Sequence, residues 1–177
     1  MIRIISEYLA KDDLAMLRRF AKWVLSTMVR PSLLRKSYIC IRIMRSEDHA
    51  EGQGISDLKE YGAWVHYRGV VNGRKKFDMV LNARRLNRRA KNPIVRLKGL
   101  MLDMAHELVH VKQYLKNELF DYVDGKAKYK GEIFLIGRSD NDAVYYNSPW
   151  EIEAYGREQG LYKMFKTMLK NEAKKNK

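Results

Sequence analysis

The sequence predicts a single α+β domain with a small sheet, and three observations support this fold class. The chain has 177 residues, which suits one domain, because domains usually contain about 100 to 200 residues. Helical spacing of apolar residues near both ends predicts long helices, whereas a β-branched run and a hairpin signal in the first half predict strands. No apolar run approaches the roughly 18 residues that a membrane span needs, so we expect a cytoplasmic protein without a membrane partner.

The first two elements are predicted as a helix and a strand. Residues 6–29 repeat apolar side chains at helical spacing, and Pro31 ends the pattern because a helix interior needs the N–H that proline lacks. Residues 37–44, SYICIRIM, are rich in β-branched and aromatic side chains and predict a strand. The polar stretch 45–54 predicts a loop.

A β-hairpin is predicted next. Residues 61–71 and 75–81 are strand-like runs joined across Asn72-Gly73, which is the commonest short hairpin signal. Together with residues 37–44 they predict a small, twisted, mainly antiparallel sheet of three strands.

The last part of the chain predicts two helices. Residues 93–119 and 148–169 both have helical patterns, and Ser148 and Pro149 are favourable at a helix start. Residues 120–147 predict a long loop, with a small hairpin around GEIFLIG and AVYY. We expect one domain over residues 1–170 and a frayed basic tail over residues 171–177.

Basic residues exceed acidic ones by 14, and the excess lies in two segments. Residues 74–98 contain ten basic residues and one acid, and residues 163–177 contain six and one. Such clustering suits a polyanion such as nucleic acid, although solvated helix faces give the same pattern. The candidate nucleic-acid patch consists of arginines at helical neighbour spacing: Arg84, Arg85, Arg88 and Arg89.

Residues 106–110, HELVH, match the zinc-binding motif H-E-x-x-H. Histidines four residues apart lie one turn apart on one helix face, so both can bind the same ion. Glu107 would project beside them toward a water at the ion. We therefore predict His106 and His110 as ligands of one Zn²⁺ ion and Glu107 as the general base.

The helical wheel of residues 93–119 separates these histidines from the apolar side chains. One side carries leucines, methionines and a valine, whereas the opposite side carries His106, His110, Asp103, Gln113 and Asn117. Histidines that only filled a core would be expected among the leucines. Asp103 and Asn117 are candidates for orienting the imidazoles, with solvation as the alternative.

The third zinc ligand is expected to be a carboxylate. A catalytic zinc usually has three protein ligands, and no histidine follows His110. On the last helix, periodicity puts Glu151 on the apolar face and Glu153 on the polar face. A buried carboxylate needs a cation, so we expect Glu151 as the ligand and keep Glu153 as the alternative.

The HELVH motif followed by a Glu on a second helix resembles the zincins of the gluzincin type, and the small chain resembles their minimal versions, the minigluzincins. The longer pattern AHELVHVKQY, then a basic and aromatic loop, then SPWEIEAYGRE, is similar to small SprT-like metallopeptidases of tailed bacteriophages. The resemblance covers about residues 101–162. It implies a zincin-like fold, a zinc site built from the HELVH histidines and a downstream Glu, and peptide hydrolysis. Tyr155 stands where the family often has an Asp that braces a ligand histidine, and the third histidine of SprT domains is absent.

The implied reaction is metal-assisted hydrolysis of a peptide that adds to the sheet along an edge strand, which we expect to be residues 75–81. The candidates for stabilising the oxyanion are Tyr145, Tyr146, Tyr155 and Arg157. The histidines outside the motif, His49 and His66, carry little weight as site residues.

A second class of function is a basic nucleic-acid-associated protein whose zinc site is structural or vestigial. Glu107 favours the peptidase, because a purely structural zinc needs no carboxylate beside its two histidines.

Overall fold

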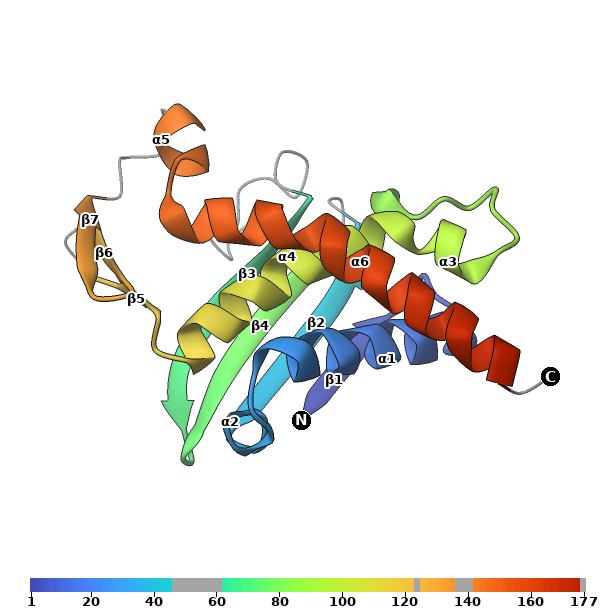
Figure 1. Cartoon of the computed structure of the whole chain (residues 1–177), viewed down its shortest axis with the longest axis horizontal. Helices are drawn as coiled ribbons and strands as arrows, with labels where there is room; N and C mark the ends of the chain where they lie inside the picture. Colours follow the sequence, from blue (N-terminus) through green and yellow to red (C-terminus); the bar gives the residue numbers. More distant parts are fainter. Residues whose placement is uncertain (46–61, 123–124, 136–141, 176–177) are drawn as a thin grey trace.

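The computed structural model describes residues 1–45, 62–122, 125–135 and 142–175. It confirms the α+β class: helices pack on a mixed four-stranded sheet, and a small antiparallel sheet lies beside them (Figure 1). In chain order the elements are β1 (Ile2–Ser6), α1 (Lys11–Met28), α2 (Pro31–Arg35), β2 (Ser37–Met44), β3 (Ala63–Val71), β4 (Arg74–Asn82), the 3-10 helix η2 (Ala83–Arg85), α3 (Pro93–Arg96), α4 (Lys98–Leu115), β5 (Leu119–Asp121), β6 (Lys126–Tyr129), β7 (Glu132–Leu135), α5 (Asp142–Tyr146) and α6 (Pro149–Lys175).

The main sheet has the strand order β1-β2-β4-β3, so it contains a strand that the sequence analysis did not predict. The pairs β1–β2 and β2–β4 are parallel and the pair β3–β4 is antiparallel, so the expectation of a mainly antiparallel sheet is wrong for this sheet. The unexpected strand is β1, whose five residues are too few for a clear pattern. Helix α1 carries the chain back across the sheet, and β2 therefore runs parallel to β1.

The edge strand is β3, not residues 75–81. Strand β4 pairs with both β2 and β3 and lies inside the sheet. The hairpin itself is confirmed: Asn72 and Gly73 have φ values of 52° and 68°, which a two-residue turn between twisted strands requires. One edge of β3 is consequently left without a partner strand in the described part of the chain.

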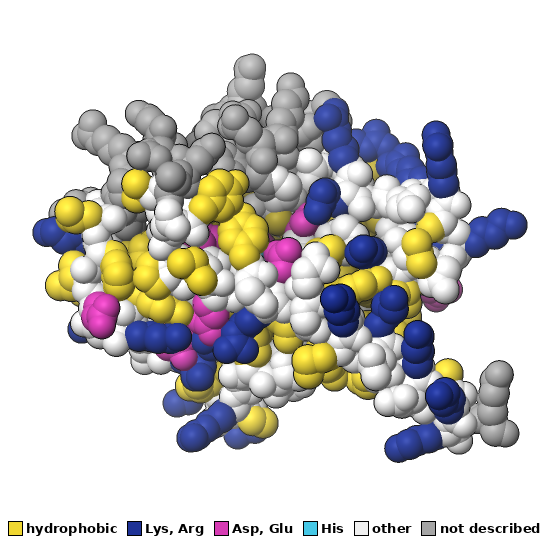
Figure 2. Space-filling model, turned by 45° about the horizontal axis from the view of Figure 1, so that its top comes forward, with side chains coloured by type: hydrophobic (Ala, Val, Ile, Leu, Met, Phe, Trp, Pro, Cys, Tyr) yellow, Lys and Arg dark blue, Asp and Glu magenta, His cyan; other side chains and the backbone are white. Residues whose placement is uncertain are grey.

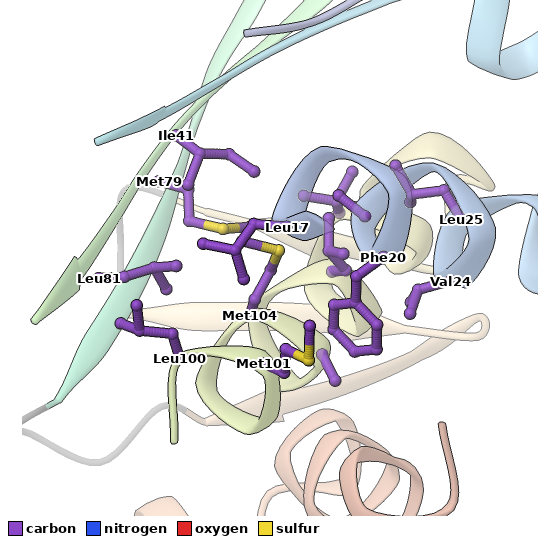
Figure 3. Packing of buried hydrophobic residues seen from close by; sticks show 14 of the residues in the cluster. Leu17, Phe20, Val24, Leu25, Ile41, Met79, Leu81, Leu100, Met101 and Met104 are labelled. Carbon is purple, nitrogen blue, oxygen red and sulfur yellow. The ribbon is translucent and has the colours of Figure 1, made fainter. Parts of the chain in front are cut away.

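The hydrophobic core lies between the sheet and the helices α1 and α4 (Figure 3). Leu17 and Phe20 of α1 are fully buried, as are Met79 of β4 and Met104 of α4. Helix α6 crosses over α4 and α1 on the side away from the sheet, where Phe165 packs against Phe20 at 5.0 Å between ring centroids. Helix α4 is therefore a middle layer, and its polar stripe is covered by α6 instead of facing solvent.

The predicted helix 93–119 is divided and shorter than expected. Helix α3 ends at Arg96, and α4 begins at Lys98 and ends at Leu115. Asn117 then adopts a left-handed conformation with φ of 56°, which is typical of the residue after a helix end, and the chain continues into β5.

The region 120–147 contains more regular structure than a long loop. Strands β5, β6 and β7 form a small antiparallel sheet, in which β6 and β7 are joined through the positive-φ residues Lys130 and Gly131. The expected hairpin partner AVYY lies in α5 instead. Strands of three or four residues are too short for a periodic pattern to identify.

Helix α6 continues to Lys175, so the expected frayed tail is helical as far as the described residues reach. Arg19 of α1 forms an ion pair with Glu172, which attaches this last part to the domain. None of the helices in the described ranges is long and apolar enough to cross a membrane.

Two helical glycines give a direct test of this packing. A Cβ at Gly99 would overlap the main-chain oxygen of Arg85, whereas a Cβ at Gly156 would meet nothing within 4 Å. We expect Gly99→Ala to lower the free energy of unfolding by about 1–3 kcal/mol through overpacking. Gly156→Ala, the control, should raise it by about 0.5–1 kcal/mol through helix propensity. Urea denaturation measures both, and equal effects of the two substitutions would contradict the close approach of α4 to η2.

Candidate metal centre

The crossing of α4 and α6 brings His106, His110 and Glu151 together. The Nε2 atoms of the two histidines are 3.2 Å apart, and the Glu151 carboxylate oxygens lie 3.2 Å from His106 Nε2 and 3.4 Å from His110 Nε2. The two histidines are each 8% exposed and Glu151 is 4% exposed. This buried group could hold a metal ion, because one donor atom from each residue lies within 4.8 Å of the others.

The electrostatics of the group favour a cation. Burial alone would raise the pKa of Glu151, but the close imidazoles of His106 and His110 outweigh it and lower that pKa to about 2. Burial alone would lower the pKa of His110, but its hydrogen bond with Glu151 and the charges of Glu107 and Glu151 raise it to about 9. Surroundings that stabilise a proton on a buried imidazole have a negative potential, and the same potential attracts a metal cation.

Hydrogen bonding within the group is incomplete, which also fits an ion. Glu151 Oε2 is buried and forms no hydrogen bond of regular geometry among the described residues, although His106 Nε2 lies 3.2 Å away. An orphaned buried carboxylate oxygen is costly, and coordination is a usual way to satisfy it. The donor set of two imidazole nitrogens and a carboxylate is one that transition metals such as zinc accept.

Each histidine has a second contact through its Nδ1 atom. His110 Nδ1 lies 2.9 Å from Gln113 Oε1, and His106 Nδ1 lies 3.4 Å from Glu158 Oε2. The Tyr155 ring packs edge-on against His106 with ring centroids 4.4 Å apart. Glu158 was not among the predicted site residues, although it lies seven residues after Glu151 and therefore on the same face of α6.

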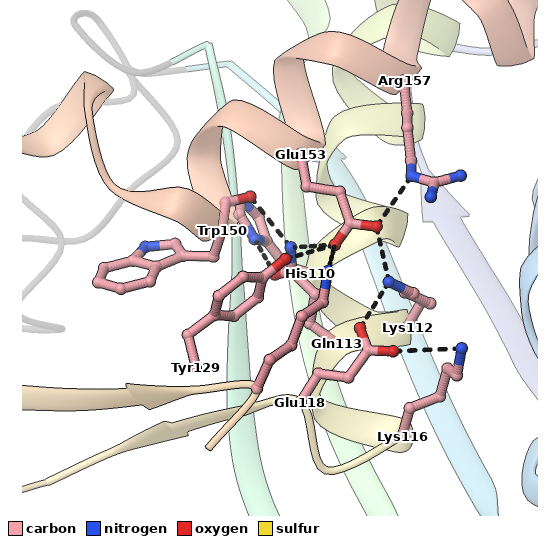
Figure 4. A network of polar contacts seen from close by, with 10 residues as sticks. His110, Lys112, Gln113, Lys116, Glu118, Tyr129, Trp150, Glu153 and Arg157 are labelled. Atoms are coloured by element: carbon pink, nitrogen blue, oxygen red, sulfur yellow. Dashed lines mark hydrogen bonds and ion pairs between the residues drawn. The ribbon is translucent and has the colours of Figure 1, made fainter. Parts of the chain in front are cut away.

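Glu153, the alternative ligand, is held away from this group. Its carboxylate accepts hydrogen bonds from Lys112, Tyr129 and Gln113 (Figure 4). Burial alone would raise the pKa of Glu153, but these hydrogen bonds outweigh burial and lower the pKa to about 2. Arg157, an oxyanion candidate, donates to the same carboxylate at 2.9 Å and lines neither cavity beside the histidines.

Two cavities meet beside the metal-binding group, and Glu107 lines both. One, of about 350 Å³, is bordered by the edge strand β3 and by His110, Glu151 and Trp150. The other, of about 260 Å³, is bordered by His106 and by the acidic side chains Asp103 and Glu158. Glu107 is 6% exposed, and burial raises its pKa.

The three tyrosines predicted as candidates for stabilising the oxyanion line these cavities. Tyr145 and Tyr146 line both, and Tyr155 lines the second. Burial, the charge of Glu151 and a hydrogen bond with it raise the pKa of Tyr145, so its hydroxyl keeps its proton.

The two residues expected to orient the imidazoles bond elsewhere. Asp103 forms a bidentate pair with Arg85 at 3.0 and 3.1 Å, and Asn117 Oδ1 accepts from Lys75 Nζ at 2.5 Å. His66 is exposed on β3, and His49 lies outside the described residues.

The arginine patch is divided by the structure. Arg85 belongs to the second cavity, whereas Arg84, Arg88 and Arg89 line a separate hollow together with Arg45. Lys and Arg side chains crowd the right-hand side of Figure 2, where Figure 1 has α3 and the C-terminal half of α6.

Comparisons with known proteins identify no relative: no family model matches the sequence, and no curated protein or solved structure matches it significantly.

The metal centre can be tested by thermal denaturation. Zn²⁺ at 100 times its Kd should stabilise the wild type by about 2.7 kcal/mol, because the ion binds the folded chain only. Glu151→Gln should lose most of this stabilisation, whereas Glu132→Gln on the exposed strand β7 should keep it. Mg²⁺, which prefers oxygen ligands, should have little effect in a parallel titration. An equal Zn²⁺ response of the Glu151 variant and the wild type would exclude Glu151 as a ligand.

Proposed function

We propose that this protein is a zinc-dependent metallopeptidase of the gluzincin type. The observation that carries the proposal is the position of Glu107, a buried carboxylate that lines both cavities directly beside the group His106, His110 and Glu151. A site that only bound an ion for stability would not need a further carboxylate at the cavities.

The chemistry of the site suits hydrolysis. When bound by His106, His110 and Glu151, zinc would polarise a scissile carbonyl and favour deprotonation of a water. Glu107 accepts the proton of the attacking water and passes it to the leaving amine. Tyr145 lies at both cavities with its protonated hydroxyl bonded to Glu151, and it would turn this hydrogen bond to the oxygen that becomes negatively charged once Glu151 binds the ion.

The edge strand β3 is the surface that would align a peptide. Ala63, Trp64 and Val65 of β3 line the larger cavity opposite the metal-binding group. An extended peptide can add to an unpaired edge through main-chain hydrogen bonds, so β3 takes the role that the sequence analysis gave to residues 75–81.

Substitution of the general base tests the proposal. Glu107→Gln should lower kcat/KM by about 10²- to 10⁴-fold, because an amide of the same size cannot accept the proton. Its Zn²⁺ content should remain that of the wild type, since Glu107 is not a ligand. Cleavage of a mixed peptide library, followed by mass spectrometry, and metal analysis measure the two effects. Equal cleavage by the variant and the wild type would remove Glu107 from the mechanism.

Binding of nucleic acid is the second candidate function, and one specific observation favours it. The hollow beside η2 is lined by Arg45, Arg84, Arg88 and Arg89, and its described lining residues include no acid. We propose that this surface binds DNA or RNA weakly and without sequence preference, through contacts with phosphates. The bound nucleic acid would lie beside the peptidase site, because the neighbouring Arg85 lines the second cavity.

Charge reversal at the hollow tests this second function. Arg84, Arg88 and Arg89 are replaced by Glu, which changes the formal net charge from +14 to +8; Arg85 is kept because it pairs with Asp103. The control replaces the exposed Lys11, Lys22 and Lys36, which lie outside both basic segments, by Glu and has the same net charge. Fluorescence anisotropy at two salt concentrations should show salt-sensitive binding that the arginine variant loses and the control keeps. Equal binding by both variants would leave the hollow without this role.

A further inference from the structure

A group of polar side chains beside His110 has a defined hydrogen-bond direction. We call it the Gln113 network; it consists of Gln113, Glu153, Lys112, Tyr129 and Arg157 (Figure 4). It joins α4, α6 and β6, and Gln113 at its centre is 0% exposed.

The orientation of the Gln113 amide is determined by its neighbours. Gln113 Nε2 donates to the main-chain oxygen of Trp150 at 3.0 Å and to Glu153 Oε2 at 3.2 Å. Both partners are oxygens that can only accept, so a flipped amide would place an oxygen against two acceptors. The amide oxygen Oε1 must therefore face His110.

This orientation selects one tautomer of His110. Gln113 Oε1 accepts but cannot donate, and it lies 2.9 Å from His110 Nδ1. His110 must then carry a hydrogen on Nδ1. In the neutral imidazole the lone pair is left on Nε2, the atom that points to His106 and Glu151.

Glu153 is itself held by several donors from different elements. Lys112 Nζ lies 2.7 Å from Glu153 Oε1, Arg157 Nε donates to the same oxygen at 2.9 Å, and the Tyr129 hydroxyl donates to Oε2 at 2.7 Å. Lys112 is 4% exposed and also pairs with Glu118 at 2.5 Å. The acceptor that fixes the Gln113 amide therefore cannot turn away without breaking its buried ion pair with Lys112.

We propose that Gln113 is a positioning residue of the metal centre, which holds His110 as the Nδ1–H tautomer with Nε2 directed at the ion, and that Glu153 fixes Gln113 in this orientation. The inference rests on metal binding in the proposed function but not on peptide hydrolysis.

Two variants and a control test it by Zn²⁺ affinity, measured by competition with a chromophoric chelator. Gln113→Met removes the acceptor at nearly constant volume and should weaken Zn²⁺ binding about 10- to 100-fold, as is usual for residues that orient a ligand histidine. Glu153→Gln keeps the shape but weakens the amide lock, so it should cause a smaller loss in the same direction. Gln159→Met makes the same chemical change at an exposed site of α6 and should not alter the affinity.

Nitrogen-15 NMR of histidine in the Zn²⁺-loaded protein supplies a readout that a purely structural role would not change. The wild type should show a slowly exchanging proton on His110 Nδ1, and Gln113→Met should lose this protection. If Gln113→Met does not fold, as judged by circular dichroism, Glu153→Gln decides. Wild-type affinity and Nδ1–H exchange in the folded variants would overturn the inference. If the wild type binds Zn²⁺ with the expected dependence on Gln113 but cleaves no peptide, the peptidase function fails and the inference stands.

Discussion

A buried carboxylate that faces two buried imidazoles is the constraint on which the arrangement of α4 and α6 depends. Burying Glu151 without a cationic partner would cost several kcal/mol, so the helices can pack only in the register that places it against His106 and His110. The apolar contacts of Phe165 with Phe20 and Trp23 hold α6 against α1 and do not specify its register on α4. The polar group therefore specifies the arrangement, and the core supplies its stability.

Polar groups at the same interface fall into two sets with different physical behaviour. Lys112 lies between Glu118 and Glu153, and its charge is balanced by the protein itself. The group of His106, His110 and Glu151 is only partly satisfied, since Glu151 Oε2 and His106 Nδ1 form no regular hydrogen bond within the described residues, although His106 Nε2 and Glu158 Oε2 lie 3.2 and 3.4 Å from them. Balanced groups support a structure, whereas a group with unused donors and acceptors can bind.

The group of His106, His110 and Glu151 could be predicted from the sequence, but the residues that contact and orient it could not. His106 and His110 are neighbours through local helix geometry, and the periodicity of α6 was enough to select Glu151 over Glu153. Gln113 and Glu158 could not be assigned roles in the same way, because their contacts depend on how α4 and α6 cross. The prediction of a three-stranded, mainly antiparallel sheet was wrong for a similar reason. The pairing of β1 with β2 across α1 is a tertiary contact that no local pattern encodes.

The division of the metal-binding group between two helices has a consequence for folding. Both histidines belong to α4, whereas the carboxylate belongs to α6, which packs on the outside of α4. A partly folded chain with α6 detached would keep the histidine pair but lack the third donor, and its cavities would lack their α6 walls. A bound ion would then have its three donors only when α6 is docked on α4, so its affinity would report the docking of α6.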